Sequence, residues 1–406
     1  MPRAGWVKPE TDQRLSDHIS LGVLTRVFPP DLVDRVVADS GRMQVRHRLL
    51  PARVVVYYVL ALALFSQASY EEVMRNLVEG LSWSTGWARS WRMPSKVALS
   101  KARTRLGPEP LQALFEAVAA PLGAPTTRGA FYRGWRLMAV DGTCVDVADT
   151  PENDAAFGRP GTGRGQGVGA FPQVRMVGVA ECGTHALVDV AAGPYREAEK
   201  TLASKVFRAL RPGMLLAADR GFFSFELWQQ AAQTGADLLW RAKSNQDLAV
   251  EEVLEDGSYL SRVYENANGN RRGKGIPVRV IVYTIDDPGR PQAEPSYRLI
   301  TTILDPARGP AVELAALYEQ RWEFETMLDE LKTHQRGSRV VLRSKLPEGV
   351  RQELYGYLCV HFAIRWLMHS VALAVDADPD RLSFIRTLRV ARRTTASHPG
   401  FSPSGS

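Results

Sequence analysis

Residues 318–332 read Tyr-Glu-Gln-Arg-Trp-Glu-Phe-Glu-Thr-Met-Leu-Asp-Glu-Leu-Lys. The stretch has no glycine or proline and is rich in strong helix formers, which predicts a helix. At about 100° per residue, one arc of that helix carries a phenol, two cations and a carboxylate, which belong to Tyr318, Arg321, Lys332 and Glu325. The adjoining arc is apolar and consists of Leu317, Phe324, Met327, Leu328 and Leu331. We therefore expect one side of the helix to pack and the face beside it to offer reactive groups.

Two aspartates upstream of this helix each lie at the end of an apolar run. They are Asp141 in LMAVDGTCVDV and Asp219 in MLLAADRGFF. The helix spacing Tyr-x2-Arg-x3-Glu-x6-Lys, together with these two positions, resembles the DDE transposases of the insertion-element-4 group. All four positions of that group's helix motif match here. The resemblance implies that Asp141, Asp219 and Glu325 are the catalytic acids.

A simpler interpretation exists for each of these features taken alone. Charged residues beside an apolar stripe are usually a solvated flank of a helix, and a single aspartate at a strand end is commonly a turn-former or an N-cap. The combination of the helix motif with two aspartates in the right order favours the catalytic interpretation. Asp146 and Asp329 are spare carboxylates that could take the place of one of the three.

The chemical requirements of phosphodiester cleavage indicate which cofactor to expect. Two divalent ions roughly 4 Å apart can activate the attacking oxygen and stabilise the leaving one, and Mg²⁺ requires oxygen ligands. We expect two Mg²⁺ ions, or Mn²⁺ in their place, held by Asp141, Asp219 and Glu325. The resemblance implies that Tyr318, Arg321 and Lys332 hold DNA phosphates beside the metals, a role that suits a guanidinium and an ammonium. We also expect Arg220 to contact DNA.

The excess positive charge lies entirely in the N-terminal third. The chain of 406 residues has 51 Lys and Arg against 44 Asp and Glu, a net charge of +7 and a pI near 9.3. Residues 1–133 hold 18 of those bases and 11 of those acids, so the remaining 33 bases and 33 acids cancel. A basic surface of this kind suits a polyanionic partner such as nucleic acid.

The interval between Glu79 and Glu109 contains bases but no acid. Its bases are Arg89, Arg92, Lys96, Lys101, Arg103 and Arg105, and Trp83, Trp87 and Trp91 lie before or within them. Basic residues interleaved with aromatics indicate a nucleic-acid surface, with residues 95–106 as a helix and Arg92, Lys101 and Arg105 in contact with DNA. The alternative is a solvated basic helix above core tryptophans. The segment LSDHISLGVLTRVFPPDLVDRVV also resembles the N-terminal region of the same transposase group.

The order of elements predicts the fold class. We expect strands at 135–147, 173–180, 185–192, 214–218 and 237–242, with helices at about 196–210, 224–234 and 310–334. This order fits an α/β ribonuclease-H-like core with a β-subdomain inserted at about 246–305. We predict an all-helical DNA-binding domain at 1–121, the catalytic domain at 134–340, and a C-terminal helical region with a disordered tail at 341–406.

Tyr297 begins YRLITTIL, a strand that leads back to the catalytic helix. Relatives that form DNA hairpins place a tryptophan in this part of the chain for a flipped base, so the resemblance implies that Tyr297 stacks on an extruded base. An aromatic face can recover roughly 1–3 kcal/mol of lost stacking. The alternative is a tyrosine packed in the β-subdomain.

Nothing in the sequence indicates export or a membrane. Cys144, Cys182 and Cys359 are odd in number and form no CxxC pair, which predicts reduced thiols without a zinc site. The longest apolar run, residues 54–65, is 12 residues long, short of the roughly 20 that span a bilayer, and we expect a buried core helix there. The N-terminus has no signal-peptide segment. We expect a cytoplasmic protein that associates with the nucleoid when bound to DNA.

Together these features predict a cut-and-paste DNA transposase. It would hydrolyse strands at the ends of its element and join 3′-hydroxyls to target DNA. Some relatives cleave through a DNA hairpin intermediate, and the sequence alone leaves that route open here. Its partners would be double-stranded DNA at terminal inverted repeats and at the target, bound by a dimer in a synaptic complex. The alternatives are a metal-dependent nuclease of the same fold that cuts without joining, and a non-catalytic DNA-binding protein descended from a transposase.

Overall fold

The structure is a computed structural model of the chain. It describes residues 22–43, 50–85, 93–161, 169–265, 275–284, 296–337 and 341–397. Arg92, the tryptophans at 87 and 91, and the predicted disordered tail lie outside the described residues.

The chain forms two compact units that divide it differently from the predicted domains. The first unit comprises residues 1–119, 145–173 and 329–406, and the second comprises residues 120–144 and 174–328. The N-terminal and C-terminal helical segments, predicted as separate domains, therefore belong to one unit. The reason is the packing of the C-terminal helices against the N-terminal ones, which is described below.

A ten-stranded sheet forms the backbone of the second unit, with the path β4-β3-β2-β5-β6-β10-β9-β8-β7 and β1 paired to β2. The strands are β1 (Phe131–Tyr132), β2 (Trp135–Asp146), β3 (Gln173–Glu181), β4 (Leu187–Pro194), β5 (Met214–Ala218), β6 (Asp237–Arg241), β7 (Glu252–Val253), β8 (Tyr259–Val263), β9 (Ile276–Tyr283) and β10 (Tyr297–Thr301). β5 is parallel to both of its neighbours, β2 and β6. β1 pairs antiparallel with β2, β3 with β4, and the strands from β6 through β10, β9 and β8 to β7 pair antiparallel in turn. The strands predicted from the sequence are confirmed.

The inserted segment continues the main sheet. β10 pairs antiparallel with β6 through Ile300 and Trp240, and on its other side with β9 through Ile300 and Val280. β6 would otherwise leave a row of unpaired backbone groups at the sheet edge, and β10 satisfies them. The predicted β-subdomain is thus an extension of the ribonuclease-H-like sheet.

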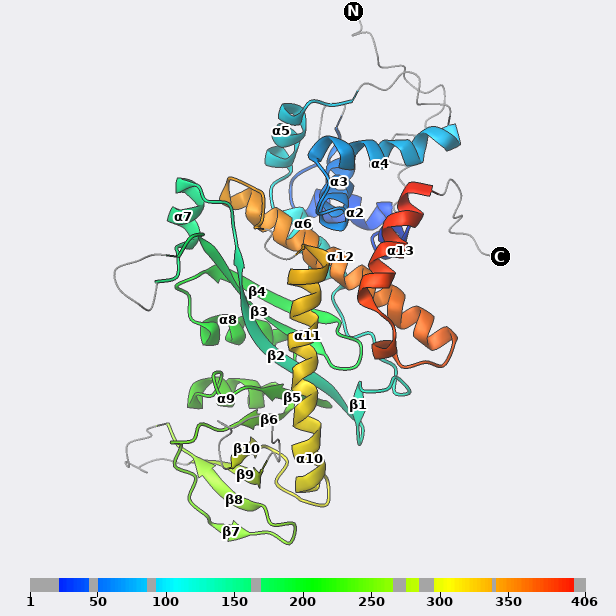
Figure 1. The fold of residues 1–406 in the computed structure, drawn as a ribbon. Coiled ribbons are helices and arrows are strands. Elements are labelled where there is room, and N and C mark those ends of the chain that lie inside the picture. The colour runs from blue at the N-terminus through cyan, green and yellow to red at the C-terminus, as the bar shows by residue number, and fades with distance from the viewer. Residues whose placement is uncertain are drawn as a thin grey trace, which may run out of the picture. The chain divides into compact units, whose positions relative to one another are not determined.

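Helices cover the sheet of the second unit on both faces (Figure 1). Met138 and Val140 of β2 pack in one core cluster with α8 (Glu199–Val206), the 3₁₀ turn η3 (Phe207–Ala209) and α9 (Phe225–Gln233). Because side chains alternate along a strand, Leu137 and Ala139 point to the other face. There Leu137, Leu215 and Ala217 line a small cavity together with Leu317 and Arg321.

The predicted helix at 310–334 is a continuous helical run of changing pitch. It consists of α10 (Ala311–Tyr318), the 3₁₀ turn η4 (Glu319–Arg321), α11 (Trp322–Asp329) and the π-helical turn η5 (Glu330–Gln335). A 3₁₀ turn or π turn inside a helix often marks a functional position, because it changes which residues share a face. The 3₁₀ turn ends at Arg321, directly before α11, which carries Glu325.

The first unit is a helical bundle. Its helices are α1 (Val23–Val27), α2 (Pro30–Asp39), α3 (Ala52–Leu64), α4 (Tyr70–Thr85), α5 (Lys96–Leu106), α6 (Glu109–Val118), α7 (Pro151–Phe157), α12 (Pro347–Ala374), the 3₁₀ turn η6 (Pro379–Arg381) and α13 (Phe384–Ser397). Serine side chains cap α4 and α5, since Ser69 Oγ accepts from Glu72 N and Ser95 Oγ accepts from Ala98 N, both at 3.2 Å.

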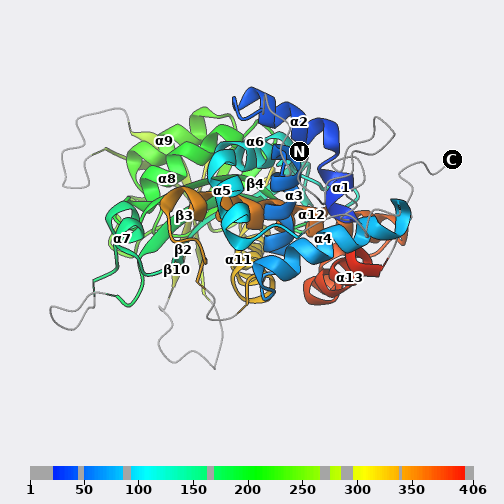
Figure 2. The ribbon, with the colours of Figure 1, turned by 90° about the horizontal axis from the view of Figure 1, so that it is seen from above.

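α12 is the central helix of this bundle. It packs against α3, α6 and α13 (Figures 1 and 2). Gly356 allows the close approach of α3, because a Cβ at that position would lie 3.0 Å from Val59 Cγ1. α12 is also long and apolar enough, by length and composition, to cross a membrane. Within this unit, however, 67% of its most apolar window is buried, as expected for a core helix.

A buried ion network joins α12 to the π turn. Arg365 Nε donates to Glu330 Oε2 at 2.9 Å, its Nη2 contacts Oε1, and His361 Nε2 lies 3.3 Å from Oε2. All three side chains are buried. Removing one member of a buried ion pair leaves the other charge without compensation, which costs about 3–5 kcal/mol.

We therefore expect Glu330→Ala to lower the free energy of unfolding by about 3–5 kcal/mol in chemical denaturation. Glu313→Ala is the matched control, because Glu313 pairs with Arg133 at 2.9 Å on the exposed surface. That variant should lose far less, since exposed ion pairs contribute little. Equal losses in the two variants would show that the buried network does not hold α12.

Candidate active site

The parallel pairing of β2 with β5 brings two of the predicted acids together. The register places Val140 opposite Ala218, so that Asp141 and Asp219 are the next residues on neighbouring strands. Adjacent strands lie about 4.8 Å apart. Val140 and Ala218, which directly precede the two aspartates, face the core cluster around α8 and α9. Because successive side chains along a strand alternate between its two faces, Asp141 and Asp219 point to the opposite face, which carries α11.

Glu325 reaches the same place from α11 through Arg321. Arg321 Nη1 lies 3.3 Å from Asp141 Oδ2, and Nη2 lies 3.3 Å from Glu325 Oε1. The Arg321 residue is 7% exposed, whereas the Glu325 side chain is 44% exposed. The guanidinium therefore bridges a strand carboxylate and a helix carboxylate, and it is buried while doing so.

Burial and charge act in opposite directions on these groups. Burial raises the pKa of Asp141, the Gly142 N–H and the Arg321 charge oppose this, and the charges of Glu325 and Asp219 add to the rise. Burial lowers the pKa of Arg321, but the charges of Tyr318, Asp141, Asp219 and Glu325 outweigh it and raise that pKa. Glu325 and Asp219 are thus close enough to Asp141 to affect its pKa, as expected of carboxylates in one site.

The donor set fits a hard divalent cation. Asp141 and Glu325 both contact Arg321, Asp219 lies near enough to affect the pKa of Asp141, and all three supply only oxygen ligands, the kind that Mg²⁺ and Mn²⁺ prefer. Mutual repulsion among the acids makes the cluster receptive to added positive charge. Asp141, Asp219 and Glu325 would hold the ions.

Tyr318 supports the site from the sheet side. Its hydroxyl donates to the carbonyl oxygen of Ala218 at 3.2 Å, and burial raises its pKa. The Arg321 guanidinium carbon lies 6.0 Å from the Tyr318 ring centre. Tyr318, Arg321 and Glu325 are therefore brought together. Arg220 is exposed and directly follows Asp219, and Lys332 lies in η5 of the first unit, partly exposed.

Comparison with known families agrees with this geometry. Residues 18–116 match the insertion element 4 transposase N-terminal family, and residues 133–363 match the transposase DDE domain family. Transposase InsG for insertion sequence element IS4 of Escherichia coli K12 is 31% identical over 379 residues, which covers 92% of this chain and 83% of that protein. The chain is a DDE transposase of the insertion-element-4 group. Such an enzyme is a polynucleotidyl transferase and endonuclease, and DDE domains use divalent metal ions.

The comparisons also found a second curated protein and a solved structure. The putative transposase InsZ of Escherichia coli K12 is 25% identical over 251 residues, which covers 62% of this chain and 80% of that protein. A cryo-EM structure of a piggyBac transposase synaptic complex with hairpin DNA shares 11% identity, with a TM-score of 0.48, over 92% of this chain and 79% of that chain.

The transposase exposes two of its predicted N-terminal DNA contacts on α5. Lys101 and Arg105 are exposed, and Arg92 lies outside the described residues. Arg103, in the same basic interval, is buried: its Nε donates to Gln352 Oε1 at 2.8 Å and its Nη2 to Ser344 Oγ at 3.0 Å. Arg103 therefore holds α5 to α12 and belongs to the core of the bundle.

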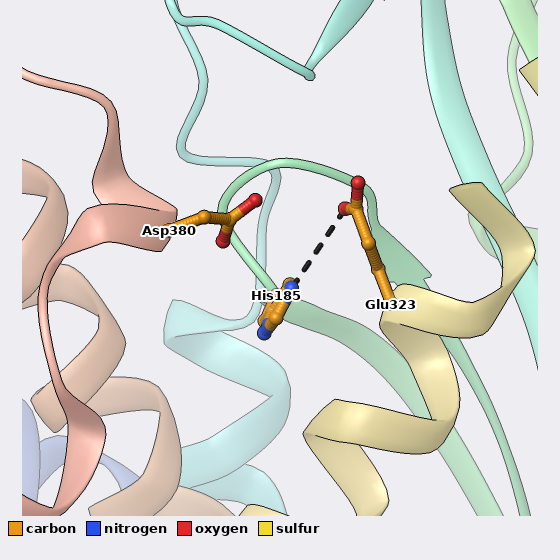
Figure 3. A group of neighbouring side chains, drawn as sticks. All are labelled: His185, Glu323 and Asp380. Carbon is orange, nitrogen blue, oxygen red and sulfur yellow. Dashed lines mark ion pairs between the residues drawn. The ribbon is translucent and has the colours of Figure 1, made fainter.

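One contact of the catalytic helix was not foreseen in the sequence. Glu323 accepts a hydrogen bond from the backbone N–H of Gly183, and its Oε2 lies 3.7 Å from His185 Nε2 (Figure 3). Gly183 has a φ of +76°, and a Cβ there would lie 2.6 Å from the Arg128 carbonyl oxygen. The turn between β3 and β4 thus requires glycine, and it fixes α11 two residues before Glu325. The third side chain drawn in Figure 3, Asp380, belongs to the first unit.

Tyr297 is packed inside the sheet region. It is 9% exposed, its ring lies 5.5 Å from the ring of Tyr283, and the Arg241 guanidinium carbon lies 4.5 Å from its ring centre. Both neighbours come from strands that flank β10. This arrangement is the one expected from the packing alternative, and base stacking by Tyr297 stays a prediction.

We expect Tyr297→Ala to lower the free energy of unfolding by roughly 3 kcal/mol, because a large buried ring is lost. Tyr297→Phe keeps the ring and should stay close to the wild type in the same denaturation experiment. An unchanged stability of Tyr297→Ala, with normal first-strand nicking but slow hairpin formation or resolution, would instead assign the ring to base stacking.

Proposed function

We propose that this transposase cuts DNA at the ends of its element and joins the released 3′-hydroxyls to target DNA. The placement of Asp141 on β2, of Asp219 directly after β5 and of Glu325 on α11, with Arg321 between Asp141 and Glu325, carries the proposal. When bound there, two divalent ions would supply activation of the attacking oxygen and stabilisation of the leaving one. We assign Mg²⁺ as the resident ion, with Mn²⁺ able to replace it.

The protein's own contribution is positioning. Asp141 lies on β2 and Asp219 directly follows β5, the parallel strand paired with it, which restricts their relative movement. Glu325 lies on a helix fixed to the β3–β4 turn through Glu323 and Gly183. Carboxylates on such rigid elements hold a metal in a defined place relative to the scissile phosphate. Tyr318, Arg321, Lys332 and Arg220 would contact phosphates of the bound DNA.

We expect Asp141→Asn, Asp219→Asn and Glu325→Gln each to slow cleavage by more than about 100-fold, the upper range for loss of a partner outside the ligand shell. Asp329→Asn is the control, because Asp329 is an exposed acid one turn further along the helix, paired with His334 at 3.2 Å. The measurement is cleavage of DNA carrying the inverted repeats that flank the coding sequence, with Mg²⁺. If Asp329→Asn lost cleavage activity while Glu325→Gln kept it, Asp329 and not Glu325 would be the catalytic acid of the helix.

Strand transfer separates the transposase from the nuclease alternative. Pre-cut element ends with free 3′-hydroxyls are mixed with a target plasmid and Mg²⁺, and joined products are scored. Joining that depends on Asp141, Asp219 and Glu325 supports the proposal, and cutting without joining identifies a nuclease. Absence of both in a folded protein that binds element ends identifies the non-catalytic alternative.

We further propose that α5 contacts the double-stranded DNA of the terminal repeats, that a dimer assembles the two ends in a synaptic complex, and that the protein works in the cytoplasm at the nucleoid. The exposure of Lys101 and Arg105, in an interval without an acid, supports the DNA contact. The buried Arg103 supports it indirectly, because it fixes the helix that presents them.

Each phosphate contact contributes about one unit to the slope of log binding constant against log salt. We therefore expect Lys101→Gln and Arg105→Gln, in the full-length protein, each to lower that slope by about one unit on element-end DNA. Lys205→Gln, which removes an exposed charge paired with Glu197 at 2.6 Å, should leave the slope unchanged. Unchanged slopes in all three variants would make α5 a purely structural helix.

A further inference from the structure

Arg321 occupies an unusual position for a residue expected to hold DNA. Its guanidinium lies between Asp141 and Glu325, 3.3 Å from an oxygen of each. It is buried, and its Nε has no hydrogen-bond partner among the described residues. Trp322 lies against it, with 4.9 Å between the guanidinium carbon and the ring centre. The side chain is therefore turned into the acid cluster and away from solvent.

The charges of the cluster define what this cation does. Asp141, Asp219 and Glu325 carry three negative charges when ionised, and Arg321 compensates one of them. The two divalent ions of the proposed function would bring four positive charges to a cluster in which Arg321 already contacts two of the carboxylates. Like charges at this spacing repel strongly where water is scarce. Arg321 and the divalent ions therefore compete for the same carboxylates.

We propose that Arg321 is the internal counter-ion of the metal-free site and that it weakens divalent-ion binding in the absence of DNA. The inference rests on the proposed function, because it takes the three acids as the metal ligands. It adds a second role to Arg321: the guanidinium holds Asp141 and Glu325 in place before the metal arrives, and it must be displaced from them when the metal binds.

The contacts are suited to such an exchange. Strong charge-assisted hydrogen bonds between a guanidinium and a carboxylate are about 2.7–2.9 Å long, and both Arg321 contacts are longer than that. Each is made through a single oxygen, so both carboxylates keep a second oxygen and further lone pairs for a metal. Glu325 is partly open to solvent, which provides a path for the incoming ion. By contrast, the Arg208–Asp189 pair in the same unit is made through two nitrogens, with Nε 2.6 Å from Oδ2.

The experiment measures Mn²⁺ binding to the full-length, DNA-free protein by calorimetry, and thermal unfolding with and without Mn²⁺. Arg321→Met removes the charge and keeps an apolar side chain. We expect it to lower the melting temperature without metal, to tighten the Mn²⁺ dissociation constant by about tenfold or more, and to enlarge the rise in melting temperature on adding Mn²⁺. Arg321→Lys retains the charge and should bind Mn²⁺ as the wild type does.

Arg208→Met is the matched control, because it also breaks an arginine–aspartate pair of the second unit. It should lower the melting temperature and leave the Mn²⁺ dissociation constant unchanged. Equal Mn²⁺ affinity in wild type, Arg321→Met and Arg321→Lys would overturn the proposal. If Arg321→Met does not fold, Arg321→Gln takes its place. Tighter Mn²⁺ binding by Arg321→Gln than by the wild type would support the proposal, and equal Mn²⁺ affinity would overturn it.

Asp141→Asn distinguishes failure of this inference from failure of the proposed function. If Asp141→Asn loses Mn²⁺ binding and Arg321→Met has no effect on it, the assignment of the metal site to the three acids stands. Only the counter-ion role of Arg321 is then rejected. Unchanged Mn²⁺ binding in Asp141→Asn would place the metal elsewhere, and both proposals would fall.

Discussion

The parallel pairing of β2 with β5 is the constraint on which the site depends. Its register sets Val140 opposite Ala218, and this makes Asp141 and Asp219 neighbours on one face of the sheet. Side chains alternate along a strand, so a slip of one residue would turn one aspartate into the core cluster around α8 and α9. The apolar runs that precede both aspartates prevent that slip, because Met138, Val140 and Leu216 would lose their buried positions. The acids are thus placed by the packing of the residues before them.

The acids and the main strands could be predicted because they depend on local pattern. Spacing along one helix joins Tyr318, Arg321 and Glu325, and an apolar run ending in aspartate identifies each strand. The contacts that could not be predicted are between segments distant in the sequence. Glu323 meets Gly183 across 140 residues, and Arg103 meets Gln352 across 249. The sequence does not distinguish a buried arginine with an uncharged partner, such as Arg103, from an exposed base such as Lys101 or Arg105. All bases between Glu79 and Glu109 were therefore predicted to belong to one exposed basic surface.

The same limit explains the domain boundaries. α12 is apolar around most of its circumference, and such a helix must be covered on several sides. α3 and α6, which come from the start of the chain, cover it. A fragment that ends near residue 121 would leave the apolar faces of α3 and α6 without their partner. The N-terminal helices therefore owe their stability to the C-terminal segment, and the DNA contact that we propose for α5 would need the whole chain.

Arg321 and Glu325 lie four residues apart on one helical run, so they cannot separate by movement of the helix. In the exchange that we propose, Arg321 would therefore leave the carboxylates by rotation of its side chain. The anchor between Glu323 and Gly183 strengthens this argument, because it holds the backbone of α11 while the side chain moves. Binding linkage is reciprocal, so under this proposal a phosphate that draws the guanidinium away from Asp141 would raise metal affinity, and the metal would raise phosphate affinity by the same factor. One side-chain rotation would then couple the presence of DNA to the loading of the acids, with no change of fold.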